Sequence, residues 1–146
     1  MEFDFKKLEN GIICRTAEKL IDLGEAFGRL LGDGDIVALH GDLGAGKTTF
    51  VKGIGRAFRV TDSVTSPTFS MMAEYSGTMN LVHIDAYRLD NSERLEVLEY
   101  IQSPYVIVVE WPESLIELRE SITHTIRIVA RENGDRWVTG VAKKML

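Results

Sequence analysis

Gly41-Asp42-Leu43-Gly44-Ala45-Gly46-Lys47-Thr48-Thr49 has the spacing of a phosphate-binding loop, in which two glycines flank four residues and are followed by Lys and Thr. An apolar run of strand length, 35–40, precedes this segment, and a helical pattern begins at Thr49. Glycines let the backbone curl so that successive N–H groups point into one concavity, and the N-terminus of the helix adds partial positive charge there. The sequence therefore predicts a strand, a loop and a helix that together bind a polyphosphate.

The residues of this loop have different expected roles. We expect Lys47 to reach the β- and γ-phosphates of a nucleoside triphosphate and the Thr48 hydroxyl to ligate the bridging Mg²⁺. The expected nucleotide-binding residues of the loop are Asp42, Leu43, Gly44, Ala45, Gly46, Lys47, Thr48 and Thr49. The chain has no Asn-Lys-x-Asp run of the kind that reads guanine, so ATP is favoured over GTP.

Length and composition limit the class of protein. The 146 residues are expected to form one domain, 1–146, and the net charge of −5 argues against a protein that grips nucleic acid by itself. The single cysteine, Cys14, excludes an internal disulfide and is expected to be a small buried hydrophobe. We find no signal-peptide pattern and no apolar run of membrane length, so the expected location is the cytoplasm.

Hydrophobic periodicity predicts alternating strands and helices. Strands are expected at 12–14, 35–40, 69–75, 79–85, 105–110, 125–129 and 137–141. Helices are expected at 17–31, 49–58, 92–101 and 113–119, the first capped by Thr16 and the third by Ser92. This pattern predicts an α/β fold with a single P-loop NTPase-like domain, whose central sheet is mixed but mostly parallel, flanked by helices and extended by antiparallel hairpins.

Apolar stripes predict how the first two long helices are buried. In the first helix the stripe consists of Leu20, Leu23, Phe27, Leu30 and Leu31. In the second helix it consists of Phe50, Val51, Ile54, Ala57 and Phe58. Gly53 and Gly55 weaken the second helix, which indicates close approach to a neighbouring element.

A phosphate loop needs a carboxylate at the end of a neighbouring buried strand to hold Mg²⁺ directly or through water. Two acids compete for this place, Asp85 and Glu110. Glu110 ends the more apolar strand and is favoured for the metal shell, which leaves Asp85 to polarise the attacking water or to complete the outer shell. The reverse assignment stays open.

Three residues near these acids have both a functional and a structural interpretation. Arg88 could neutralise charge on the γ-phosphate or pair with an acid. Trp111 could contact the nucleotide or pack in the core, and His83 could relay a proton with Asp85 or be a hydrogen-bonded structural histidine. The remaining histidines are scattered and the chain has one cysteine, so a zinc site is not expected.

The polar segment 61–68 follows the phosphate-loop helix, at a position where nucleoside triphosphatases often carry a switch. Its candidate γ-phosphate sensors are Thr65, Ser66 and Thr68. A solvated loop is the alternative interpretation.

Four motifs in this order resemble the TsaE (YjeE) family. They are Gly-Asp-Leu-Gly-Ala-Gly-Lys-Thr-Thr-Phe at 41–50, Thr-Ser-Pro-Thr-Phe at 65–69, His-x-Asp-x-Tyr-Arg-Leu at 83–89 and Glu-Trp-Pro-Glu at 110–113. The resemblance implies a bacterial Mg²⁺-dependent ATPase required for making threonylcarbamoyladenosine at adenosine 37 of tRNAs that read codons beginning with A. It also implies that the ATPase acts with TsaD and TsaB, that hydrolysis resets this assembly between turnovers, and that tRNA is met through the complex.

Carried over by position, the resemblance also implies site residues. It assigns phosphate contact to Gly44, Gly46, Lys47 and Thr49 and Mg²⁺ ligation to Thr48 and Glu110. It makes the loop 65–68 switch-like and places Asp85 and Arg88 near the γ-phosphate or the partner face.

Two other functions share the phosphate loop. Small-molecule kinases carry the same loop, but they also need a lid arginine, for which Arg131 and Arg136 in a predicted hairpin are poor substitutes. A nucleotide-controlled scaffold would bind ATP through Lys47 without needing hydrolysis.

Overall fold

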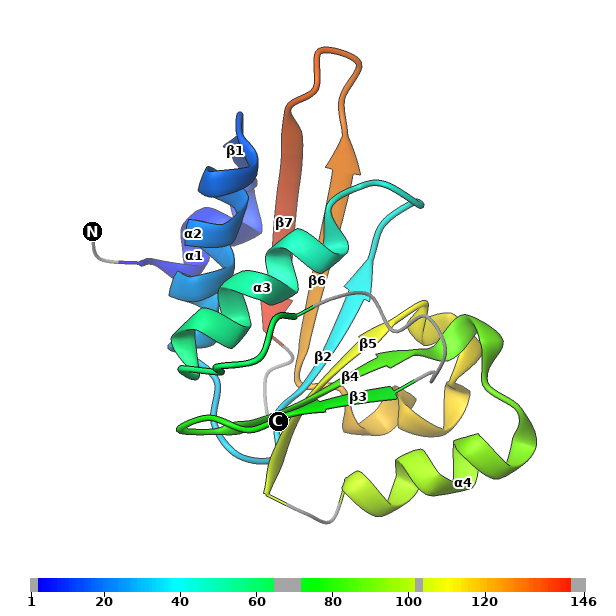
Figure 1. Cartoon of the computed structure of the whole chain (residues 1–146). Helices are drawn as coiled ribbons and strands as arrows, with labels where there is room; N and C mark the ends of the chain where they lie inside the picture. The colour runs from blue at the N-terminus through cyan, green and yellow to red at the C-terminus, as the bar shows by residue number, and fades with distance from the viewer. Residues whose placement is uncertain (1–2, 65–71, 102–103, 143–146) are drawn as a thin grey trace.

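The computed structural model describes residues 3–64, 72–101 and 104–142, and for Arg88 the backbone alone. These residues form one seven-stranded sheet with helices on both faces (Figure 1). The order across the sheet is β1-β7-β6-β2-β5-β4-β3. The strands are β1 Ile12–Cys14, β2 Ile36–His40, β3 Met72–Tyr75, β4 Asn80–Asp85, β5 Tyr105–Glu110, β6 His124–Ala130 and β7 Arg136–Ala142. The predicted α/β class with a mixed sheet is confirmed.

The middle of the sheet is parallel and its edges are antiparallel. Strands β6, β2, β5 and β4 run parallel, whereas β1–β7, β7–β6 and β4–β3 pair antiparallel. Strand β4 therefore belongs both to the predicted hairpin with β3 and to the parallel core. This double membership brings Asp85 to the end of a core strand, directly opposite Glu110 in the register of β4 and β5.

The described helices lie on opposite faces of the sheet (Figure 1). The α-helices are α1 Phe5–Asn10, α2 Ala17–Gly28, α3 Lys47–Ala57 and α4 Asn91–Tyr100. Short 3₁₀ helices span Ala86–Arg88, Pro112–Ser114 and Ile116–Ser121. Within these described ranges, no helix is both long enough and apolar enough to cross a bilayer.

Alternating side chains divide the core into two layers. In β5, Val106 and Val108 face α2 and α3, and Ile107 and Val109 face α4 and the 3₁₀ helices. By the same alternation, the odd-numbered residues of β4 share the α3 face. His83 and Asp85 therefore lie on the face of the sheet that carries the phosphate loop.

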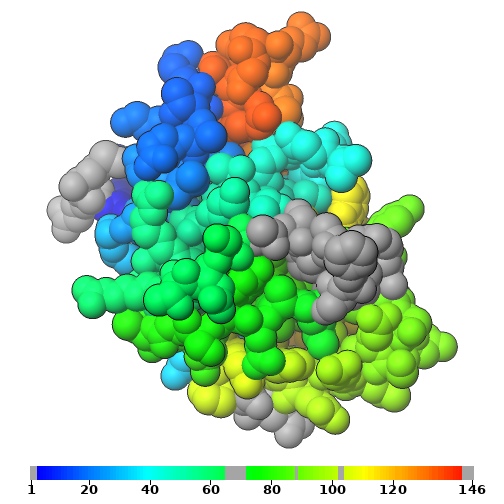
Figure 2. All heavy atoms as spheres, viewed as in Figure 1, coloured from blue at the N-terminus to red at the C-terminus, as the bar shows by residue number. Residues whose placement is uncertain are grey.

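Helices α2 and α3 cross where two glycines meet, and Figure 2 shows them side by side on the molecular surface. A Cβ on Gly53 would lie 2.2 Å from the Ile21 carbonyl oxygen, and a Cβ on Gly24 would lie 2.2 Å from that of Phe50. The close approach predicted from Gly53 is confirmed.

Several sequence expectations are corrected. Leu30 is 49% exposed because α2 ends at Gly28, which takes Leu30 off the buried stripe. Helix α4 is capped by Asp90 rather than Ser92, and the segment 113–119 forms two 3₁₀ helices instead of one α-helix. Helix α1 was not predicted, because its six residues are too few to show a periodic pattern.

Candidate phosphate-binding site

The loop 41–46 connects the end of β2 to the first turn of α3 (Figure 1). Its glycines are required by the backbone, since Gly44 has φ 81° and Gly46 has φ 109°, in the left-handed region. A Cβ on Gly41 would lie 2.8 Å from the Ile128 carbonyl oxygen of β6. The loop therefore has the curled backbone and the helix N-terminus of a phosphate cradle.

Lys47 is the first residue of α3 and is only 6% exposed. Its Nζ lies 3.6 Å from Glu110 Oε1 and 3.9 Å from the centre of the Trp111 ring. A cation over an indole face is attracted by the ring quadrupole. Trp111 therefore lies beside the loop lysine, with its ring face toward the Lys47 ammonium group.

Glu110 ends β5 and is buried, with 7% of its surface exposed. Burial acts to raise the pKa of this carboxyl, but the hydrogen bond from His83 and the charges of His83 and Lys47 outweigh burial and hold the pKa below its usual value. Glu110 is therefore a buried carboxylate at neutral pH, held at the end of the strand beside the phosphate loop.

Of the two interpretations of His83, the structure supports a hydrogen-bonded histidine, whose partner is Glu110. Its Nε2 lies 2.5 Å from Glu110 Oε2. Asp85, two residues along the same face, accepts a hydrogen bond from the Tyr87 amide at 3.1 Å and caps the 3₁₀ helix Ala86–Arg88. The ring of His83 is thus hydrogen-bonded to Glu110 on the neighbouring strand β5.

Other predicted site residues fall partly or wholly outside the described structure. Arg88 ends the 3₁₀ helix after Asp85, and only its backbone is described. The switch candidates Thr65, Ser66 and Thr68 lie outside the described residues.

Thr48, the predicted Mg²⁺ ligand of the loop, is within the described residues. It follows Lys47 in the first turn of α3 and is half-buried.

The family model described as "Threonylcarbamoyl adenosine biosynthesis protein TsaE" matches residues 14–138, which include every element of this site. The chain belongs to the TsaE family. It is 36% identical over 130 residues to the tRNA threonylcarbamoyladenosine biosynthesis protein TsaE of Treponema pallidum, covering 87% of this chain and 96% of the relative. The Streptomyces coelicolor TsaE protein is 40% identical over 136 residues, with 84% and 91% covered.

A solved TsaE-family structure has the same fold. The crystal structure of Bacillus subtilis YdiB superposes with a TM-score of 0.73 at 31% identity, covering 90% of this chain and 84% of YdiB. Because the superposition covers 90% of this chain, the site geometry above is set in a fold shared with YdiB.

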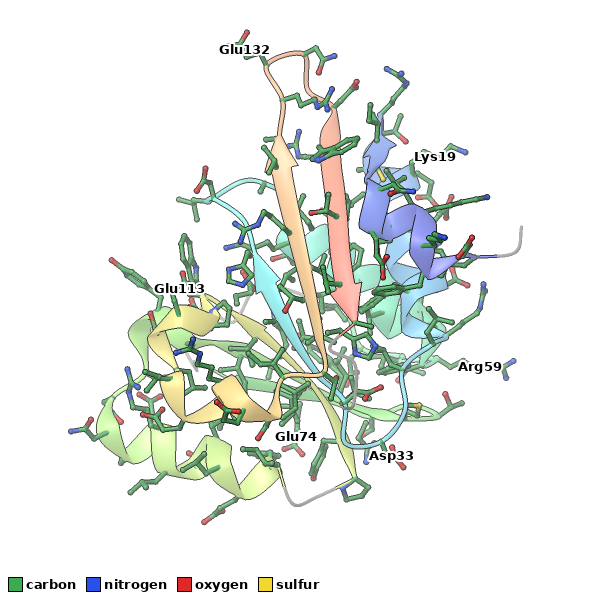
Figure 3. All side chains as sticks on the ribbon, turned by 180° about the vertical axis from the view of Figure 1, so that it is seen from behind. Lys19, Asp33, Arg59, Glu74, Glu113 and Glu132 are labelled. Atoms are coloured by element: carbon green, nitrogen blue, oxygen red, sulfur yellow. The ribbon has the colours of Figure 1, made fainter. Side chains whose placement is uncertain are left out.

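Two cavities flank the loop of this TsaE-family chain. One, of about 240 Å³, lies between the loop and the end of β6 and is lined by His40, Leu43, Trp111, Glu113 and Arg127, among others. Glu113, labelled in Figure 3, approaches His40 Nδ1 to 3.4 Å. The other, of about 130 Å³, lies on the α2 side.

The smaller cavity adds residues that the sequence did not place beside the loop. Arg15, Thr16 and Arg136 line it together with the predicted loop residues Gly46 and Thr49, among others. Arg136 Nη2 donates a hydrogen bond to the Gly44 carbonyl at 3.3 Å. No local pattern predicts this contact, because it depends on the pairing of β7 with β1 and β6, and of β6 with β2, the strand that leads into the loop.

The residues of this TsaE-family site fit a nucleotide-bound Mg²⁺ ion. Mg²⁺ usually takes one or two protein oxygens and completes its octahedron with phosphates and water. A hydroxyl at Thr48 and a buried carboxylate at Glu110 supply that kind of donor set. In the described part of the chain, no group of three or more His, Cys, Asp or Glu side chains is arranged to hold a metal by itself.

Proposed function

We propose that this chain is the ATP-binding, Mg²⁺-dependent ATPase subunit of threonylcarbamoyladenosine biosynthesis and acts in the cytoplasm with TsaD and TsaB on adenosine 37 of tRNA. The observation that carries the proposal is the pairing of the loop lysine with a strand-end carboxylate, Lys47 Nζ to Glu110 Oε1 at 3.6 Å. The names of the TsaE relatives support the pathway.

In this proposal the phosphates of ATP bind to the N–H groups of the loop and the first turn of α3. Lys47 moves from Glu110 toward the β- and γ-phosphates, which carry more negative charge than one carboxylate. Thr48 and Glu110 hold Mg²⁺, which when bound neutralises charge on the phosphate oxygens. Trp111 flanks the nucleotide, and Arg136 holds the loop from the opposite side.

Hydrolysis needs an oriented water, and Asp85 is the proposed residue for that task. It lies at the end of β4, opposite Glu110 in register, so its carboxylate is on the loop side of the sheet. Arg88 is proposed to stabilise the charge that develops on the γ-phosphate. Hydroxyls of Thr65, Ser66 and Thr68 are proposed to sense that phosphate.

The proposed role of hydrolysis is to reset the TsaB–TsaD assembly between turnovers, and tRNA contacts this subunit only through the assembly. The net charge of −5 supports this arrangement, since a tRNA-gripping protein needs a basic face.

The test is ATP turnover by the purified chain, alone and with TsaB, TsaD and tRNA. We expect slow hydrolysis by the chain alone, a faster rate with the partners, and no nucleotide binding by Lys47→Ala. Unchanged affinity and turnover on adding both partners would refute the coupling. Stoichiometric phosphoryl transfer to a metabolite would support the kinase alternative instead.

One variant distinguishes an ATPase that needs hydrolysis from a scaffold that needs only nucleotide binding. Asp85→Asn is expected to bind ATP with near-normal affinity and to lose hydrolysis, and cells that carry it are expected to lose the tRNA modification. Normal modification in those cells would favour a nucleotide-controlled scaffold.

A further inference from the structure

His83 is a buried polar residue that the proposed ATPase chemistry does not use. It lies in the middle of β4 with no exposed surface, between the apolar residues Val82 and Ile84 of the opposite face. Its side chain is on the same face as the phosphate loop. A histidine at this position needs a reason, because burying an imidazole without full hydrogen bonding is costly.

Among the described residues, the imidazole ring of His83 makes one hydrogen bond, to Glu110. A carboxylate oxygen accepts hydrogen bonds, so His83 Nε2–H is the donor in this pair. His83 Nδ1 is buried without a partner in the described part of the chain. A histidine kept for core stability alone would be expected to satisfy both ring nitrogens. The hydrogen bond to Glu110 is therefore the one hydrogen bond that this ring makes within the described residues.

The two oxygens of Glu110 have different partners. Oε2 accepts from His83, and Oε1 faces Lys47 Nζ at 3.6 Å. With Oε2 held from β4, the carboxylate cannot turn about its last bond without breaking that hydrogen bond. Oε1 is thereby presented to the first turn of α3, where Lys47 and Thr48 lie.

We propose that His83 is a positioning residue for Glu110. His83 holds one oxygen of the Glu110 carboxylate, so that the other oxygen points toward the metal position beside Thr48. The inference rests on the proposed function, in which Glu110 helps to hold Mg²⁺. Hydrogen-bonding partners of metal ligands commonly fix the orientation of the ligand, and their loss lowers metal affinity. Without His83, Glu110 Oε2 would lose its hydrogen-bond donor from β4, and the carboxylate would be free to rotate.

A matched pair of variants tests this role. His83→Leu and His83→Gln have similar volumes, but only the Gln side chain keeps an N–H donor that can reach Glu110. The readout is the affinity of the ADP complex for Mn²⁺. It is measured from the electron paramagnetic resonance signal of free Mn²⁺, which decreases as the ion binds. We expect His83→Leu to weaken Mn²⁺ binding about tenfold and His83→Gln to restore it to within about threefold.

Two controls separate positioning from stability. ADP affinity without metal is expected to change less than about twofold in both His83 variants, since Glu110 does not contact the nucleotide directly. His124→Leu, a change at a half-buried histidine outside the site, is expected to leave Mn²⁺ affinity unchanged. If His83→Leu does not fold, His83→Asn replaces it, because its shorter amide does not reach Glu110.

A double-mutant cycle identifies the route of action. If His83 acts through Glu110, His83→Leu will have no further effect on Mn²⁺ affinity in a Glu110→Ala protein. If Glu110→Ala weakens Mn²⁺ binding and His83→Leu does not, or if Gln is as defective as Leu, the positioning role is wrong and the proposed function stands. If Glu110→Ala itself has no effect, the metal role of Glu110 in the proposed function fails, and the inference fails with it.

Discussion

Arg136 brings a positive charge to the phosphate loop from a strand that is distant in sequence. Its Nη1 donates to the Gly134 carbonyl at 2.7 Å and its Nη2 to the Gly44 carbonyl at 3.3 Å. The side chain therefore links the tip of the β6–β7 hairpin, where Glu132 is labelled in Figure 3, to the loop. It also lines the smaller cavity next to Thr49.

We expect Arg136→Ala to weaken ATP binding about tenfold, because a charge-assisted hydrogen bond that orders the loop contributes about 1.4 kcal/mol. Isothermal titration calorimetry measures the affinity. Arg131→Ala is the matched control, since Arg131 lies over the Trp137 ring at 5.0 Å and lines neither cavity. An Arg136→Ala protein with the affinity of the Arg131→Ala protein would contradict this role.

Trp111 should report directly on the lysine beside it. In a Trp137→Phe protein Trp111 is the sole tryptophan, because the chain has two. ATP is expected to draw Lys47 off the indole ring and so to change the Trp111 fluorescence. The Lys47→Ala protein is expected to show no ATP-dependent change. A constant signal at an ATP concentration that calorimetry shows to be saturating would place Trp111 outside the nucleotide's influence.

The crossing of α2 and α3 depends on the missing side chain at Gly53. A Cβ there would meet backbone atoms, 2.2 Å from Ile21 O and 2.7 Å from Glu25 N, which cannot move without separating the helices. Overpacking of this kind costs about 3 kcal/mol, and the better helix propensity of Ala returns about 1 kcal/mol.

We therefore expect Gly53→Ala to lower the free energy of unfolding by about 2 kcal/mol, measured by urea denaturation. The matched control is Gly32→Ala, where a Cβ would meet nothing within 4 Å and φ is not positive. We expect Gly32→Ala either to leave the free energy of unfolding unchanged or to raise it by up to about 1 kcal/mol. Equal stability of the two variants would mean that the helices separate at little cost.

The elements that the sequence predicted well are those defined by contacts near in sequence. Helix α2 begins at Ala17 after its Thr16 cap, and the buried run of β5 ends at Glu110, both as predicted. The cap of α4 was wrong, because both Asp90 and Ser92 are suitable capping types. The structure selects Asp90 by a capping box with Glu93.

Two histidines make the stability of the whole molecule depend on pH. Burial, partly opposed by Asp35, lowers the pKa of His124 below 6.5. Burial and the charge of Arg127 lower the pKa of His40 in the same direction. Below pH 6.5 the unfolded chain takes up protons that the folded protein does not yet bind, so acidification favours unfolding.

We expect the free energy of unfolding to fall as the pH decreases from 7 through 6.5 and toward the lowered pKa values. His124→Gln and His40→Gln should each flatten this dependence, and the double variant should flatten it most. Denaturation at a series of pH values measures the slope. If the double variant keeps the slope of the parent protein, other groups are responsible for it.

Local spacing was enough to predict the strand, glycine loop and helix at 36–57, the α/β class and Glu110 as a strand-end acid. A loop of this kind is encoded in consecutive residues, since the left-handed conformations of Gly44 and Gly46 and the N-terminus of α3 follow from adjacent positions.

The partners of the loop depend on strand order, which is not local. Pairing β4 with β5 brings His83 to Glu110, and pairing β7 with β1 and β6 brings Arg136 to Gly44. These segments are far apart in the chain and come into contact only when the sheet forms. The order of the strands depends on burying both faces of the whole sheet, which no local pattern encodes. The sequence thus determined the glycine loop and the helix that follows it, and the tertiary structure determined which residues surround that loop.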